Sequence, residues 1–151
     1  MYEPDGQTPL GAAQRPFVML VEDDVAQATM YQLGLQAAGF RVAVFSDASA
    51  LFEALEMEVP DIAVLDWRFT GTLTGVDIIE NMRLDKRLVG LPILMLSNHN
   101  GQVDGAAHRA LEAGAIEWLI KARTTPRQLA ARLRLAVGAE SVQLLGREAG
   151  S

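Results

Sequence analysis

The stretch Phe17-Val18-Met19-Leu20-Val21-Glu22-Asp23 decides the fold of this chain. Five apolar residues end in two acids, and the pattern recurs where the apolar residues 62–65 end in Asp66. Short apolar runs of this kind are typical of buried parallel strands. Sites in open α/β sheets lie at the carboxyl ends of such strands, so we expect Glu22, Asp23 and Asp66 to converge at one edge.

Two later apolar runs end in polar groups of a different kind. Residues 91–96 are followed by Ser97, and residues 116–120 are followed by Lys121. Acids that are brought together repel one another unless a cation lies between them. Three acids, a hydroxyl and a lysine at the ends of different strands therefore outline a site for a phosphate group and a metal ion.

Strand and helix patterns alternate from residue 16 onward, with predicted strands at 17–22, 41–45, 61–66, 92–97 and 116–120. Alternation implies right-handed crossovers and a parallel sheet covered by helices on both faces. Five strands and five helices fit a flavodoxin-like, doubly wound α/β fold with strand order 2-1-3-4-5. In that order the switch point lies between the first and third strands, which are the strands that end in acids.

The predicted helices have recognisable caps and apolar stripes. Asp24 caps the first helix, with Gln27 three residues later as in a capping box. Its buried stripe is predicted to be Ala26, Met30, Leu33, Gly34 and Ala37. The fourth helix is predicted at about 102–113, with a stripe of Val103, Ala106, Ala107, Ala110 and Leu111. The fifth begins at Thr125 and Pro126.

Composition restricts the class of protein. The chain has 151 residues, of which 50% are hydrophobic and 21% charged, so one globular domain is expected. We expect an N-terminal arm at 1–15, the domain at 16–138 and a tail at 139–151. The absence of cysteine excludes disulfides and thiolate metal sites. With no membrane span, no signal-peptide pattern and a net charge of −6, we expect a cytoplasmic protein that binds neither membranes nor nucleic acid.

The ordered set of motifs resembles the receiver domain of bacterial two-component response regulators. Over roughly residues 16–138, the matching positions are Val21-Glu22-Asp23-Asp24, Leu65-Asp66, Gly75, Leu96-Ser97, Gly114-Ala115 and Trp118-Leu119-Ile120-Lys121. Each motif alone is weak, but the whole set in the right order and spacing is specific.

The resemblance implies a role for each of these residues. Asp66 would be the phosphoacceptor, which attacks a phosphohistidine of a partner kinase. Mg²⁺, with Mn²⁺ as an alternative, would be held directly by Asp23 and Asp66, through water by Glu22, and by the backbone carbonyl of Arg68. Lys121 and Ser97 would contact phosphoryl oxygens. The implied switch residues are Ser97 and Trp118, and the side chains that border the hydrolytic water are Arg68 and His99.

The sequence departs from the family pattern at several positions. The family usually has proline after the site lysine, with a cis peptide that aims the lysine, whereas this chain has Ala122. A cis bond before alanine costs about 2.5–4 kcal/mol, so the loop either runs trans or stores that strain. Trp118 stands where the family generally has tyrosine or phenylalanine, and its larger ring would restrict an inward orientation. The loop from Asp66 to Gly75 is one residue longer than usual.

The resemblance implies a non-enzymatic, phosphorylation-driven binding switch. Its expected partners are a sensor histidine kinase or phosphotransfer protein, and a downstream protein or second copy bound through the fourth helix, fifth strand and fifth helix. Three alternatives stay open: a degenerate module that binds constitutively, a phosphoryl shuttle, and a magnesium-dependent hydrolase with an aspartyl-phosphate intermediate. Such a hydrolase needs a carboxylate two residues after its nucleophile, where this chain has Arg68.

Overall fold

A computed structural model describes residues 15–67, 73–102 and 105–149, with the backbone alone for 139–149. Its centre is a five-stranded sheet in the order β2-β1-β3-β4-β5, with every neighbouring pair parallel. The strands are β1 (Phe17–Val21), β2 (Arg41–Phe45), β3 (Ile62–Asp66), β4 (Ile93–Ser97) and β5 (Glu117–Ile120). The predicted fold class and strand order are confirmed, and four of the five strands are one residue shorter than predicted.

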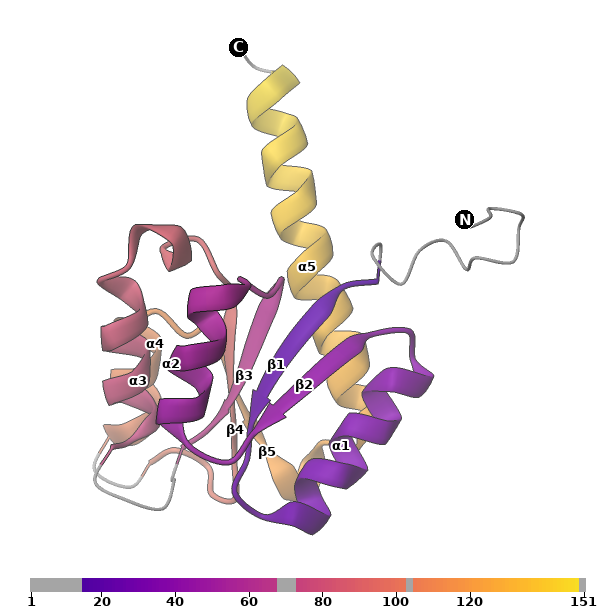
Figure 1. Cartoon of the computed structure of the whole chain (residues 1–151), viewed down its shortest axis with the longest axis vertical. Coiled ribbons are helices and arrows are strands. Elements are labelled where there is room, and N and C mark those ends of the chain that lie inside the picture. The colour runs from indigo at the N-terminus through magenta and orange to yellow at the C-terminus, as the bar shows by residue number, and fades with distance from the viewer. Residues whose placement is uncertain (1–14, 68–72, 103–104, 150–151) are drawn as a thin grey trace.

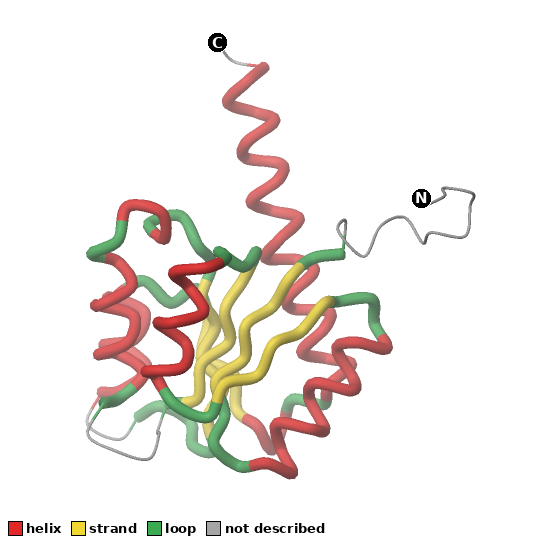
Figure 2. The backbone as a smooth tube through the Cα atoms, in the orientation of Figure 1, coloured by secondary structure: helices red, strands yellow, loops and turns green. Residues whose placement is uncertain are grey.

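Helices cover both faces of the sheet (Figure 1). The helices are α1 (Val25–Ala37), α2 (Ala48–Met57), α3 (Gly75–Arg83), α4 (Ala106–Ala113) and α5 (Pro126–Ala149). Two short 3₁₀ turns, η2 (Lys86–Leu88) and η4 (Lys121–Arg123), lie before β4 and after β5. Helices α1 and α5 lie on one face, and α2, α3 and α4 lie on the other (Figure 2).

Each face of the sheet has its own apolar core, because successive strand residues point to opposite sides. On the α1–α5 side, Val18, Leu20 and Val64 pack with residues of those two helices, including Tyr31 and Leu133. The other core is formed by α2, α3, α4, by Trp67 directly after β3, and by the alternate strand residues Met19, Val21, Ala63, Leu65 and Met95. Packing on both faces fixes the strand ends, and with them the positions of the site residues.

The predicted buried stripe of α1 is wrong. Its buried residues are Ala28, Tyr31 and Leu35, whereas Met30 and Leu33 are 46% and 60% exposed. The helix carries apolar residues around its whole circumference, so the period alone does not select a face. The predicted Asp24 cap is confirmed, since its carboxylate accepts from the Gln27 N–H at 2.9 Å.

Two further helices differ from the predictions. Helix α4 begins at Ala106, after Gly105 at φ 66°, and Leu111 is 46% exposed rather than buried; the predicted stripe residue Val103 lies outside the described residues. Helix α5 continues to Ala149, beyond the expected domain end at 138, and its C-terminal half stands clear of the sheet (Figure 1). Within the described ranges, no helix combines the length and the apolar character needed to cross a membrane.

Candidate phosphoryl and metal site

Three acids converge at the carboxyl edge of the sheet, as predicted. Glu22 and Asp23 follow β1, Asp66 ends the adjacent β3, and one carboxylate oxygen from each lies within 4.8 Å of the others. Glu22 and Asp66 are buried and Asp23 is half-buried. Three hard oxygen donors this close match the ligand preference of Mg²⁺ or Mn²⁺, so the residues present fit such an ion.

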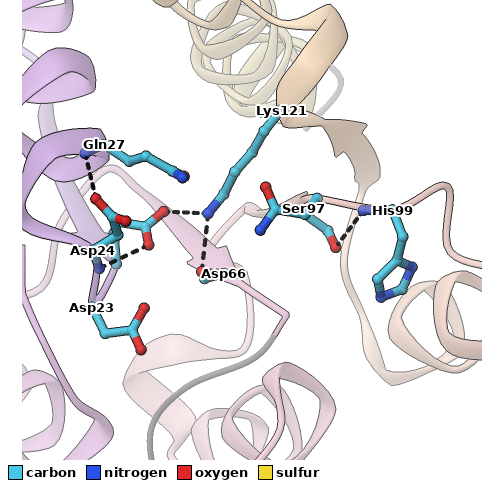
Figure 3. A pocket seen from close by; sticks show the side chains of 9 residues that line it. Asp23, Asp24, Gln27, Asp66, Ser97, His99 and Lys121 are labelled. Atoms are coloured by element: carbon cyan, nitrogen blue, oxygen red, sulfur yellow. Dashed lines mark hydrogen bonds and ion pairs between the residues drawn. The ribbon is translucent and has the colours of Figure 1, made fainter.

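Lys121 forms a buried ion pair with two of these acids. Its Nζ donates to Asp66 Oδ2 at 3.0 Å and also to Glu22 Oε1 (Figure 3). Its side chain is only 7% exposed, so the pair is shielded from solvent. The lysine compensates part of the negative charge of the cluster.

Burial and the ion pair shift the pKa values of both partners. Burial raises the pKa of Glu22, and the hydrogen bonds from Lys121 and the Asp24 N–H offset only part of that rise. Burial opposes the charge of Lys121, but the hydrogen bonds and negative charges of Glu22 and Asp66 outweigh it and raise the pKa of Lys121. The lysine is therefore charged at neutral pH, as a ligand for anionic oxygens must be.

Ser97 ends β4 on the same side of the sheet and is 2% exposed. Its Oγ accepts from the His99 N–H at 3.3 Å, which leaves the hydroxyl proton for another acceptor. Ser97 and His99 border one cavity of about 250 Å³ with the acids and the lysine. The full lining is Glu22, Asp23, Asp24, Gln27, Asp66, Ser97, Asn98, His99 and Lys121.

Trp118 packs inward against the core despite its large ring. Its Nε1 donates to the His99 carbonyl at 2.9 Å, and its ring centroid lies 5.3 Å from that of Trp67. Gly101, at φ 84°, permits this contact, because an added Cβ would lie 2.9 Å from Trp118 Cε2 and 2.4 Å from Ala107 Cβ. The loop after Ser97 is thereby fastened to β5.

Gln27, which was predicted only as a helix-cap residue, also lines the cavity. The predicted capping box is half formed, because the Asp24 N–H donates to Glu22 Oε2 at 3.1 Å instead of to Gln27. The Gln27 side chain extends toward Lys121 instead (Figure 3). Its buried Oε1 has no hydrogen-bond partner in the described part of the chain. In the sequence, the only sign of this cavity role is that Gln27 lies in the first turn of the helix that follows Glu22 and Asp23.

Two expectations concern the loops around the site. Arg68, expected to supply a carbonyl ligand and to border the water path, lies outside the described residues, as does most of the Asp66–Gly75 loop. The Lys121–Ala122 peptide is trans, since no cis bond occurs in the described chain. Gly75 is confined by its surroundings, because an added Cβ would lie 2.3 Å from Met95 Cε and 3.3 Å from the Asp66 carbonyl oxygen.

Comparison with known proteins agrees with this geometry. The response regulator receiver domain family matches residues 18–134. Over 119 residues, 79% of this chain, the sequence is 34% identical to the transcriptional regulatory protein AfsQ1 of Streptomyces coelicolor. It is 29% identical, again over 79% of the chain, to the phosphate regulon transcriptional regulatory protein PhoB of Rhizobium meliloti. The chain spans about half the length of these relatives, 50% and 51%.

Solved structures have the same fold. A response regulator from Chloroflexus aurantiacus superposes with a TM-score of 0.76 at 26% identity, covering 83% of this chain and 99% of its own. The chemotaxis response regulator CheY4 of Vibrio cholerae gives a TM-score of 0.73 at 23% identity, covering 82% and 99%. The unmatched part of this chain therefore lies at its ends, outside residues 18–134.

Proposed function

Because the chain belongs to the response regulator receiver domain family, we propose that Asp66 accepts a phosphoryl group from a phosphohistidine of a kinase or phosphotransfer protein. The observation that carries the proposal is the position of Asp66, whose carboxylate shares an oxygen cluster with Glu22 and Asp23 and lies 3.0 Å from Lys121 Nζ. A buried carboxylate that lies between other acids and an ammonium is suited to charge-compensated attack on phosphorus.

In the proposed step an oxygen of Asp66 forms a bond to phosphorus as the phosphorus–nitrogen bond of the phosphohistidine breaks. The bonding electron pair leaves with the imidazole nitrogen. Glu22, Asp23 and Asp66 would hold a divalent cation, which would supply charge neutralisation at the transferring oxygens. Lys121 would donate to one phosphoryl oxygen and the Ser97 hydroxyl to another, which the position of Lys121 Nζ next to Asp66 and the uncommitted Ser97 proton support. The product is an acyl phosphate on Asp66.

Hydrolysis of the acyl phosphate would end the signal. We propose that the side chains of His99 and Arg68 slow this hydrolysis by obstructing the path of the attacking water. The His99 Nδ1 accepts from the Gly101 N–H at 3.1 Å, so the neutral ring carries its proton on Nε2. In that tautomer Nδ1 is hydrogen-bonded and Nε2 is protonated, so neither nitrogen has a lone pair free to take a proton from the attacking water. This supports obstruction of the water by His99 over a role for His99 as a general base. Arg68→Ala combined with His99→Ala should speed decay of the phosphorylated protein, followed by intact mass, and an unchanged decay rate would contradict this role.

The phosphoryl group would act on partner binding through the face formed by α4, β5 and α5. Trp118 lies on β5 and donates a hydrogen bond to His99, whose N–H donates to Ser97 Oγ, so two hydrogen bonds connect the Ser97 hydroxyl with this face. In the alternative of constitutive binding, the Trp118–His99 hydrogen bond would keep this face in one arrangement. A partner that binds wild type and Asp66→Asn equally well would support constitutive binding.

Labelling with a small phosphodonor tests the proposal directly. Acetyl phosphate and magnesium should add one phosphoryl group to the wild-type chain, measured by intact mass, and Asp66→Asn should remove it. Labelling that survives in Asp66→Asn would place the acceptor elsewhere. The absence of labelling in the wild type would contradict the proposed function itself.

A further inference from the structure

One buried hydrogen bond connects helix α1 to the lysine loop, which consists of the turn η4 (Lys121–Arg123) and Thr124. The hydroxyl of Tyr31, in the middle of α1, donates to the carbonyl oxygen of Thr124 at 2.8 Å. Tyr31 is 1% exposed and Thr124 is buried, so water does not compete for this bond. The two residues are 93 positions apart in sequence, and the contact therefore joins two separate elements of the fold.

Thr124 closes the turn that carries Lys121. Its N–H donates to the Lys121 carbonyl at 3.2 Å, and its hydroxyl donates to the Ile120 carbonyl at 2.8 Å. The turn η4 is only three residues long. Fixing Thr124 thus fixes the backbone from which the lysine side chain extends.

A close helix contact makes this attachment rigid. An added Cβ at Gly34 would lie 2.2 Å from the Cβ of Pro126, so α1 touches the first residue of α5. The hydroxyl of Tyr31, one turn before Gly34 on α1, thereby faces the lysine loop at a defined separation. Tyr31 also lies close enough to the site for its pKa, which burial raises, to be affected by the charges of Lys121 and Glu22.

We propose that Tyr31 is a positioning residue for phosphoryl transfer, acting through Thr124 on Lys121. The lysine has a long, flexible side chain, and its ammonium must reach Asp66 and then a phosphoryl oxygen. Tyr31 does not line the cavity, so it does not touch the reacting atoms. The ring of Tyr31 fills the core, while its hydroxyl holds the loop. This role rests on the proposed function of Asp66.

Tyr31→Phe separates the two roles because it removes the hydroxyl and keeps the ring. Phosphorylation by acetyl phosphate should slow about tenfold, the low end of the loss expected when a group that orients a reactive residue is removed. Magnesium affinity, followed by tryptophan emission, should stay at the wild-type value, because Tyr31 contacts none of the three acids. A phosphorylation rate equal to wild type would overturn the proposal.

A second readout does not depend on phosphorylation. Lys86 is exposed and is the only other lysine, so it serves as an internal reference for acylation by acetic anhydride, read by mass spectrometry. In the wild type, Lys121 should react more slowly than Lys86, and in Tyr31→Phe the ratio should shift several-fold toward Lys121. An unchanged ratio would overturn the proposal. If the wild type accepts no phosphoryl group, the proposed function fails while this ratio still decides the role of Tyr31.

Two controls distinguish positioning from loss of stability. Leu35→Val also perturbs the buried face of α1, but the Leu35 side chain makes no hydrogen bond to the lysine loop. This variant should therefore lower the thermal midpoint and leave the labelling ratio and the phosphorylation rate unchanged. In a Lys121→Gln background, Tyr31→Phe should add no further loss of rate, since both changes act through one group. Losses that multiply would show that Tyr31 does not act through Lys121.

Discussion

The indole Nε1 of Trp118 donates to the carbonyl oxygen of His99 at 2.9 Å, although the two residues are 19 positions apart. The same His99 donates its N–H to Ser97 Oγ. A continuous set of hydrogen bonds therefore connects β5 with the hydroxyl proposed to contact the phosphoryl group. The Trp118 indole therefore holds the loop after Ser97 against β5.

Trp118→Phe should loosen the loop after Ser97, because it keeps an aromatic ring and removes the donor. Losing one hydrogen bond of about 1 kcal/mol should speed amide exchange at His99 and Gly101 about fivefold. Exchange in the buried strand β1 should be unaffected and serves as the control. Equal protection of the two loop amides in mutant and wild type would show that the indole does not hold the loop.

Asp23 and Glu22 should contribute unequally to metal binding. Loss of a direct ligand removes more affinity than loss of a group that acts through water, so Glu22→Ala should weaken magnesium binding about tenfold and Asp23→Ala far more. Titration calorimetry on both variants measures the difference. Equal losses would refute the assignment of Asp23 as the direct ligand.

Magnesium should also stabilise the fold by relieving repulsion among the three acids. At about 100 times its dissociation constant, a ligand that binds only the folded state adds about 2.7 kcal/mol to the free energy of unfolding. Thermal unfolding with and without magnesium should show a rise in midpoint for the wild type and almost none for Asp23→Ala. A similar rise in both proteins would place the ion elsewhere.

The raised pKa of Glu22 predicts a pH dependence of metal binding. Glu22 keeps its proton to a higher pH in the folded chain than in the unfolded chain, where the pKa of a glutamate is about 4.3. The charge on Glu22 therefore lowers the free energy of unfolding as pH rises through this window. Protons compete with the ion, so magnesium affinity should fall on acidification before ordinary carboxylates titrate. In Glu22→Gln that fall should move to lower pH, and an identical profile would contradict the shift.

The fold and the acidic site could be predicted from sequence because both depend on local patterns. Apolar runs ending in acids placed Asp66 and Asp23 at strand ends, and the strand order then brought them together. The face of α1 could not be predicted in this way, because its apolar residues surround the helix. The continuation of α5 to Ala149 was not predicted, because Gly146, Gly150 and Ser151 in the expected tail are not strong helix formers.

The rest of the site depends on contacts between residues that are far apart in sequence. The Tyr31–Thr124 and Trp118–His99 hydrogen bonds join elements whose separation is set by helix and sheet packing. Neither bond has a local sequence signal, since tyrosine and tryptophan in apolar runs are equally consistent with core packing. The Gln27 side chain likewise does not accept from the Asp24 N–H as expected, because that N–H donates to Glu22.

Site-resolved phosphorylation distinguishes Asp66 from the neighbouring acids as the phosphoacceptor. Incubation with acetyl phosphate and magnesium, followed by borohydride reduction and peptide mass spectrometry, converts an aspartyl phosphate into homoserine at the modified position. If Asp66 is the acceptor, homoserine should form at position 66 alone, should depend on magnesium and should be absent in Asp66→Asn. Homoserine at Asp23 or Asp24, or an unmodified wild-type chain, would contradict it.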